Sequence, residues 1–192
     1  FNMKNPILEA KSISKSFGNI KALDNVDFFL QKGQIHGLLG ENGAGKSSLM
    51  NILSGIYLPE KGTVTIGGKL IKRLNPDLAS SLGIGMVHQE FRLIDSFSIK
   101  DNLTLSKSNI YKNDFDKAFS KYSDIFSLNL NFMTPISKLS VGEKQKVEIM
   151  KLIFNNSSIM LLDEPTAVLT PQETAQLKVS LETLSQEDEK TI

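Results

Sequence analysis

The chain has 192 residues, a formal net charge of +1 and no cysteine. Its hydrophobic share of 40% and charged share of 22% are typical of one globular domain with a real core. The nearly neutral charge argues against a nucleic acid partner, and no apolar run approaches the roughly 20 residues that cross a bilayer. The N-terminus has no signal-peptide pattern, and the absence of cysteine excludes disulfide and thiolate chemistry.

Short apolar segments alternate with helical patterns along the chain, which predicts an α/β fold. Strands are expected at 7–14, 26–30, 35–40, 63–66, 84–87 and 159–162, and helices at 46–54, 76–82 and from 171 to about 185. Gly67 and Gly68 mark a turn, and residues 190–192 begin a further strand. The stretch 91–154 is expected to be mostly helical, with an apolar face made of Phe115, Ala118, Phe119, Tyr122, Ile125 and Phe126.

The segment after the expected strand 35–40 matches the phosphate-binding loop pattern of P-loop proteins. It consists of Gly40, Glu41, Asn42, Gly43, Ala44, Gly45, Lys46, Ser47 and Ser48. Its glycines allow backbone N–H groups to surround phosphate oxygens, and the following helix adds a favourable dipole. Lys46 can reach the β- and γ-phosphates, Ser47 can ligate Mg²⁺, and Ser48 can contact the α-phosphate. A plain Gly-rich turn is the alternative, which the strand–loop–helix context disfavours.

Two acidic residues, Asp163 and Glu164, follow the apolar run 159–162. Ligands of open α/β sheets gather at the carboxyl ends of strands. There Asp163 would hold Mg²⁺ through water, and Glu164 would act as the general base on the attacking water. Such a pair can equally be a solvated strand end, but its position downstream of a P-loop favours the catalytic interpretation.

The segment 139–145 reads Leu-Ser-Val-Gly-Glu-Lys-Gln and contains a capping box, in which Ser140 caps a helix and Glu143 folds back onto the cap. A simple helix start would explain this pattern by itself. The same geometry would also present free N–H groups and a positive helix end to an anion.

Together, these motifs resemble those of ABC ATPases, the nucleotide-binding domains of ABC transporters, over essentially the whole chain. The resemblance implies a P-loop NTPase (RecA-like) core sheet with an N-terminal antiparallel β subdomain and an inserted α-helical subdomain. The expected parts are 1–90 for the β subdomain and P-loop core, 91–154 for the helical signature subdomain, and 155–192 for the second part of the core. In this family two domains pack head to tail, so Ser140, Gly142 and Glu143 would contact the ATP of the partner domain.

The resemblance also implies roles for two further residues and for the cofactors ATP and Mg²⁺. Phe17 lies where the family stacks an aromatic ring on adenine, although a buried core Phe is the alternative. Gln89 lies where the family places a glutamine that contacts Mg²⁺ and the catalytic water.

The segments 85–89, 139–142 and 166–173 resemble those of importers of simple sugars or nucleosides, of which this chain looks like the first of two ATPase domains. Implied partners are a second nucleotide-binding domain in the same chain or a second copy, membrane permease subunits and, indirectly, a solute-binding protein. The implied location is the cytoplasmic face of the cell membrane. The alternatives are an ABC ATPase without a membrane partner and a P-loop small-molecule kinase, which would not explain the segment 139–145.

The chain departs from the common family pattern at Val141, at Glu143 and at Thr170, where Gly, Gln and Asp are usual. The orientation of Glu143 matters, since its carboxylate would repel phosphate unless it folds back as a cap. The family's switch histidine would follow the strand begun at 191–192, so we expect the C-terminal part of the domain to be missing and isolated hydrolysis to be slow. His36 and His88 are expected to be structural.

Overall fold

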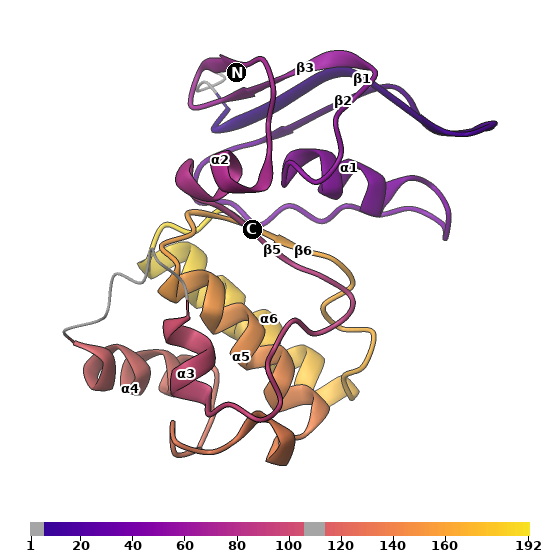
Figure 1. Cartoon of the computed structure of the whole chain (residues 1–192). Helices are drawn as coiled ribbons and strands as arrows, with labels where there is room; N and C mark the ends of the chain where they lie inside the picture. The colour runs from indigo at the N-terminus through magenta and orange to yellow at the C-terminus, as the bar shows by residue number, and fades with distance from the viewer. Residues whose placement is uncertain (1–5, 106–113) are drawn as a thin grey trace.

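The computed structural model of the protein describes residues 6–105 and 114–192. An antiparallel sheet with two short helices forms one end of the molecule, and a group of helices forms the other (Figure 1). The short parallel strands β5 and β6 lie between these two ends. None of the helices in the described part of the chain has the length and apolar character needed to cross a membrane.

The antiparallel sheet has the strand order β2-β1-β3-β4. Its strands are β1 (Leu8–Phe17), β2 (Ile20–Leu30), β3 (Lys61–Ile66) and β4 (Lys69–Ile71). The expected turn at Gly67 and Gly68 is confirmed, because it joins β3 to β4. β1 and β2 are longer than the apolar pattern predicted, because they pair with each other as far as Phe17 and Ile20 at the tip of their hairpin.

Two short helices, α1 (Lys46–Leu53) and α2 (Pro76–Ser81), pack against this sheet and agree with their predicted ranges. Both lie in the same core cluster as the inward side chains of the strands, since Leu8, Ile13 and Ile52 are fully buried in it. Asn75 caps α2 by accepting a hydrogen bond from the backbone N–H of Leu78 at 2.8 Å. This core holds the start of α1, and with it the P-loop, against the sheet.

The strands β5 (Ile84–Val87) and β6 (Ile159–Leu162) have the predicted bounds and pair in parallel, in register from Ile84 with Ile159. Thr191 forms a parallel bridge with Ile159, so the expected strand start at 190–192 lies beside β6. On its other side, the N–H of Ile192 donates to the carbonyl of Gln34 at 3.0 Å, and its carbonyl accepts from the N–H of His36 at 2.7 Å.

The predicted strand at 35–40 is wrong as a description of this structure, because that segment has no regular secondary structure. Its hydrogen bonds to Ile192 involve only its first positions. Two of its apolar side chains are exposed, Leu39 to 93% and Ile35 to 45%, whereas Leu38 packs partly against the core of the sheet. A strand is defined by pairing with a neighbour, and an apolar sequence cannot supply that neighbour by itself.

The helical end contains α3 (Ile99–Thr104), α4 (Phe115–Ile125), the 3₁₀ turn η1 (Ile136–Lys138), α5 (Val141–Phe154) and α6 (Pro171–Glu187). The predicted apolar face on α4 is confirmed, since Phe115, Ala118, Phe119, Tyr122 and Phe126 are buried and Ile125 packs against the same cluster. The expected helical stretch 91–154 includes residues 106–113, which lie outside the described residues.

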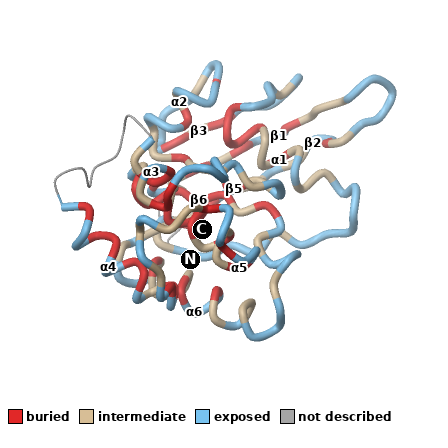
Figure 2. The backbone as a smooth tube through the Cα atoms, turned by 60° about the horizontal axis from the view of Figure 1, so that its bottom comes forward, coloured by how far each residue is buried: buried red, intermediate tan, exposed pale blue. Residues whose placement is uncertain are grey.

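The helices and the parallel strands share one core, and Figure 2 shows buried stretches along β6, α3 and α5. α6 lies alongside α5 (Figure 1), and Lys146 donates to Gln176 across the two helices at 3.3 Å. Because Met160 of β6 is fully buried in this cluster, the strand end that carries Asp163 is fixed to the helical group.

Candidate nucleotide-binding site

The P-loop joins the extended segment 35–40 to α1, and its shape depends on Gly45. Gly45 has φ +88° and is the N-cap of α1, and a Cβ there would lie 2.4 Å from the carbonyl oxygen of Ala22. Only glycine accepts both the left-handed backbone and this close approach. The loop backbone therefore passes directly over β2 before the helix begins.

Lys46 turns back over the loop that precedes it. Its Nζ donates to the carbonyl oxygens of Gly40 at 2.6 Å and of Glu41 at 2.9 Å. The ammonium group thus lies at the mouth of the P-loop, where an anion with several oxygens could exchange for these two neutral acceptors. Hydrogen bonds from an ammonium to an anion are stronger than those to a carbonyl.

Ser47 and Asp163 meet although 116 residues separate them, because the Ser47 hydroxyl donates to Oδ1 of Asp163 at 3.2 Å. Asp163 is only 8% exposed, and its backbone N–H donates to the carbonyl of Val87 at 3.1 Å, which fixes the end of β6 against β5. A hydroxyl and a carboxylate side by side are the oxygen ligands that Mg²⁺ accepts together with water and phosphate. The pair therefore suits Mg²⁺. Among residues 6–105 and 114–192 no group of three or more His, Cys, Asp or Glu forms a metal cluster.

A hollow of about 410 Å³ brings most of the predicted nucleotide-contacting residues together. Its lining consists of Ile20, Lys21, Ala22, Asn42, Gly43, Gly45, Lys46, Ser47, Ser48, Gln89 and Glu164. Gln89 and Glu164 each follow one of the two parallel strands, so the sheet delivers both to the P-loop. Glu164 has φ +49°, a left-handed conformation that costs a non-glycine residue about 1–2 kcal/mol. Strained residues of this kind concentrate at functional sites.

Phe17 lies at the tip of the β1–β2 hairpin and is 41% exposed, so it is not a buried core residue. Its ring makes an edge contact with Tyr57 at a centroid distance of 5.2 Å. Phe17 does not line the hollow, but its cross-strand partner Ile20 does. The exposure of the Phe17 ring and its position beside Ile20 support the predicted adenine contact, which stays a prediction.

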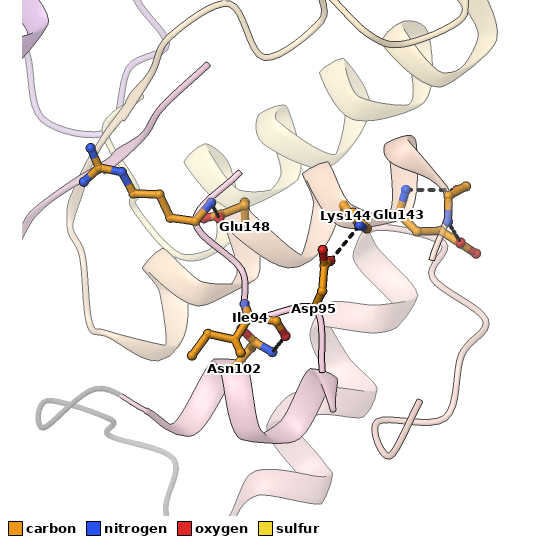
Figure 3. Close-up of polar contacts among 8 residues, drawn as sticks. Ile94, Asp95, Asn102, Glu143, Lys144 and Glu148 are labelled. Carbon is orange, nitrogen blue, oxygen red and sulfur yellow. Dashed lines mark hydrogen bonds and ion pairs between the residues drawn. The ribbon is translucent and has the colours of Figure 1, made fainter. Parts of the chain in front are cut away.

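The segment 139–145, which lies where the family has its signature motif and is called the signature segment below, forms the capping box that its sequence predicted. The Ser140 hydroxyl accepts from the N–H of Glu143 at 3.3 Å, and Oε2 of Glu143 accepts from the N–H of Ser140 at 2.8 Å. Figure 3 shows Glu143 turned back on the start of its own helix. The carboxylate is therefore engaged within the cap.

Gly142 lies in the first turn of the same helix and is buried against α6. A Cβ at Gly142 would lie 2.4 Å from Oε1 of Glu173, which belongs to a second capping box with Thr170. Among the described residues that line the hollow, neither Ser140 nor Gly142 nor Glu143 occurs. The structure thus unites the P-loop with Gln89, Asp163 and Glu164, and leaves the signature segment apart from them.

The two histidines lie in partly apolar surroundings. His36 contacts the ring edges of Phe28 and Phe29. Burial lowers the pKa of His88, and the nearby charge of Arg92 lowers it further, against the opposing effect of Glu148 and Asp163. His36 is exposed and His88 partly buried, and their structural roles stay predictions.

One buried carboxylate close to the site was missed in the sequence. Glu148 lies between Val147 and Ile149 on the apolar face of α5 and contacts the segment that follows Gln89. A charged residue within an otherwise apolar helical face was the available signal.

Comparison with curated proteins finds import ATP-binding proteins. The guanosine import ATP-binding protein NupO of Bacillus subtilis is 39% identical over 191 residues, which cover 97% of this chain and 38% of the relative. The nucleoside import ATP-binding protein NupA of Lactococcus lactis is 41% identical with the same coverage. The ribose import ATP-binding protein RbsA of Caldanaerobacter subterraneus is 42% identical over 193 residues, or 97% of this chain and 39% of the relative. The chain therefore spans under two-fifths of the length of these relatives.

Solved structures with the same fold include a nucleotide-free ATP-binding cassette from an ABC transporter, with a TM-score of 0.82 and 26% identity over 94% of this chain and 77% of that one. A dimeric bacterial ABC transporter cassette also matches with a TM-score of 0.82, at 27% identity over 96% of this chain and 85% of that one. These similarities confirm the expected P-loop NTPase core with its antiparallel β subdomain and helical part. The family model for the ABC transporter matches residues 23–167, and the chain belongs to the ABC transporter family as an ATP-binding cassette.

Proposed function

We propose that this chain binds and hydrolyses Mg²⁺-ATP to power the import of a small polar solute, a simple sugar or a nucleoside. The proposal rests on the hollow that the P-loop, Gln89 and Glu164 line together. The hydrogen bond between Ser47 and Asp163 lies next to it. A P-loop alone would support only nucleotide binding. The additional carboxylate and amide at the ends of two parallel strands support hydrolysis.

Each residue has a role that follows from its chemistry. The backbone of residues 40–48 surrounds the phosphates, and Lys46 transfers its hydrogen bonds from the loop carbonyls to phosphate oxygens. Ser47, Asp163 and Gln89 would hold Mg²⁺, which neutralises charge on the phosphates when bound. Glu164 faces the same hollow and orients and deprotonates the attacking water. Phe17 offers its ring to adenine at the hairpin tip.

The position of the signature segment supports action in trans on the ATP of a second nucleotide-binding domain. Ser140 and Gly142 lie at a helix N-terminus, and they do not border the hollow in the described part of the chain. Because Glu143 is retained by the cap, its carboxylate does not have to approach phosphate. A second domain, in the same polypeptide or in a second copy, would place its P-loop opposite this helix end.

The import function is supported by the relatives, whose names specify guanosine, nucleoside and ribose import. They are more than twice as long as this chain, which agrees with the proposal that it is the first of two ATPase domains in one polypeptide. The proposal includes permease subunits in the membrane, a solute-binding protein that delivers to them, and a location at the cytoplasmic face. The choice between sugar and nucleoside is left open, since both kinds of relative match equally well.

The direct test of the proposal is ATP binding by Lys46→Ala in the full-length protein. Loss of the ammonium removes charge-assisted hydrogen bonds to phosphate, and we expect ATP affinity to fall by at least about tenfold, measured by equilibrium dialysis. Lys121→Gln is the control, because Lys121 pairs with Asp188 at 2.6 Å on the surface of the helical end. Equal ATP affinity for wild type and Lys46→Ala would overturn the nucleotide site.

A further inference from the structure

The segment that carries Gln89 has no regular secondary structure of its own. We call residues 89–95, which run from the end of β5 towards α3, the Gln89 segment. Each of its residues is exposed or only partly buried, and Leu93 is its one residue among those packed against the core of the helical end. A glutamine that must reach a reacting water within a fraction of an ångström needs its backbone fixed by other means.

The strongest contact to this segment comes from the buried carboxylate of Glu148 on α5. Glu148 is 3% exposed, and its Oε1 accepts from the backbone N–H of Arg92. Its Oε2 pairs with Lys151 at 3.0 Å, and Lys151 in turn donates to the carbonyl of Arg92 at 2.8 Å. Both backbone polar groups of Arg92 are thus held by two residues one turn apart on the same helix.

Two weaker contacts extend this attachment. Buried Asn102 on α3 accepts from the N–H of Ile94 at 2.8 Å and donates to its carbonyl at 3.1 Å. Lys144 pairs with Asp95 at 2.8 Å, but Asp95 is well exposed and such pairs contribute little. Figure 3 shows Asn102 beside Ile94, Lys144 of α5 reaching Asp95, and Glu148 of α5 against the same stretch of chain.

Packing alone does not explain a carboxylate at this position. Val147, Ile149 and Met150, the neighbours of Glu148 along the helix, are fully buried apolar residues. Replacing a buried ion pair by apolar residues is often neutral or stabilising, so a buried charge is weak support for a purely structural role. What Glu148 provides that an apolar residue cannot is directional bonding to the Arg92 backbone.

We propose that Glu148 is a positioning residue, which couples the Gln89 segment to the helix that begins with the signature motif. α5 carries Ser140 at its N-terminal cap and Glu148 about two turns later, within a single rigid element. A shift of this helix when Ser140 engages the ATP of a partner domain would therefore be passed to Arg92 and on to Gln89. This inference rests on the proposed function, because it assigns Gln89 to the hydrolytic site.

The test compares Glu148→Ala, Glu148→Gln and Ser180→Ala in the full-length protein assembled with its partner subunits. We expect kcat to fall by about tenfold to a hundredfold in Glu148→Ala, with ATP affinity unchanged within about twofold because Glu148 does not line the hollow. Glu148→Gln should recover part of the loss, since its amide oxygen still accepts from Arg92. Ser180→Ala removes a different buried hydrogen bond of the helical end, from Ser180 to the carbonyl of Ile125 at 2.7 Å, and should keep its kcat.

These 192 residues contain no tryptophan, so Phe91→Trp adds a fluorescent reporter inside the Gln89 segment, and its emission is read as the difference from the same assembly without the substitution. ATP should change the tryptophan emission of the Phe91→Trp protein, which is the parent protein here. When Glu148→Ala is added to it, the protein should still bind ATP but lose that change in emission. Wild-type kcat and an unchanged emission response in Glu148→Ala would overturn the inference. Should Glu148→Ala fail to fold, the same two results in Glu148→Leu decide it, because leucine fills the buried position and also lacks an acceptor for the Arg92 N–H. Failure of the proposed function can be distinguished from failure of this inference, because the parent protein itself would then neither bind nor hydrolyse ATP.

Discussion

The P-loop and the helix α5 differ in how far each is stabilised by contacts within its own segment. α5 begins with a closed capping box, and much of its surface is buried within the helical core. The segment leading to the P-loop has an unmistakable sequence, but it is unpaired along most of its length, and Lys46 bonds to its own loop. A helix satisfies its backbone within one segment, whereas a strand depends on neighbours brought from elsewhere in the chain.

The largest effect expected from this difference is on stability. Phe154 is fully buried and contacts Phe115 at a centroid distance of 5.4 Å, so Phe154→Ala should lower the free energy of unfolding by about 3–5 kcal/mol. Leu39→Ala in the unpaired segment should change it by less than about 0.5 kcal/mol, because Leu39 is almost fully exposed. Both values are measured by chemical denaturation.

A large loss of stability in Leu39→Ala would contradict the comparison. It would mean that the segment 35–40 is paired and shielded in solution, as its apolar sequence had predicted.

The same difference explains what the sequence could and could not predict. The strands 84–87 and 159–162 and the start of α6 were predicted to the residue. Each has a local signal, namely a short apolar run for the strands and a proline at the first position of the helix. The segment 35–40 also has an apolar run, but a local run of this kind cannot show whether a neighbouring strand will pair with it. Glu148 was missed because its partner, the Arg92 backbone, lies 56 residues away and carries no sequence signature.

The second prediction compares alanine substitutions at two glycines of the P-loop that share a backbone conformation. Gly43 has φ +84° and Gly45 has φ +88°, so alanine meets a similar backbone strain at both. A Cβ at Gly43 meets nothing within 4 Å, whereas one at Gly45 would also lie 2.9 Å from a methyl group of Leu23. Gly45→Ala should therefore be less stable than Gly43→Ala by about 1–3 kcal/mol, measured by chemical denaturation.

ATP affinity should follow the same order, because displacing Gly45 moves the start of α1 together with Lys46. If the two variants were equally stable and bound ATP equally well, the close approach of the loop to β2 would not be a determinant of the P-loop's shape.

The smallest expected effect concerns the second capping box, on α6. Thr170 donates from its backbone N–H and its hydroxyl to Glu173, and these hydrogen bonds lower the pKa of Glu173 below its ordinary value of 4.5. The charged carboxylate therefore stabilises the fold above pH 4.5, and this contribution is lost as the pH falls through the lowered pKa. Thr170→Ala should cost about 1 kcal/mol at neutral pH.

The difference in unfolding free energy between wild type and Thr170→Ala should shrink as the pH falls through the lowered pKa of Glu173, because the hydroxyl then no longer faces a charged carboxylate in the wild type. Thr170→Ser keeps the hydroxyl that alanine lacks, so it should retain the pH dependence of the wild type. A pH-independent difference for Thr170→Ala would mean that the Thr170 hydroxyl does not hold the Glu173 carboxylate, because alanine keeps the backbone N–H that also donates to it.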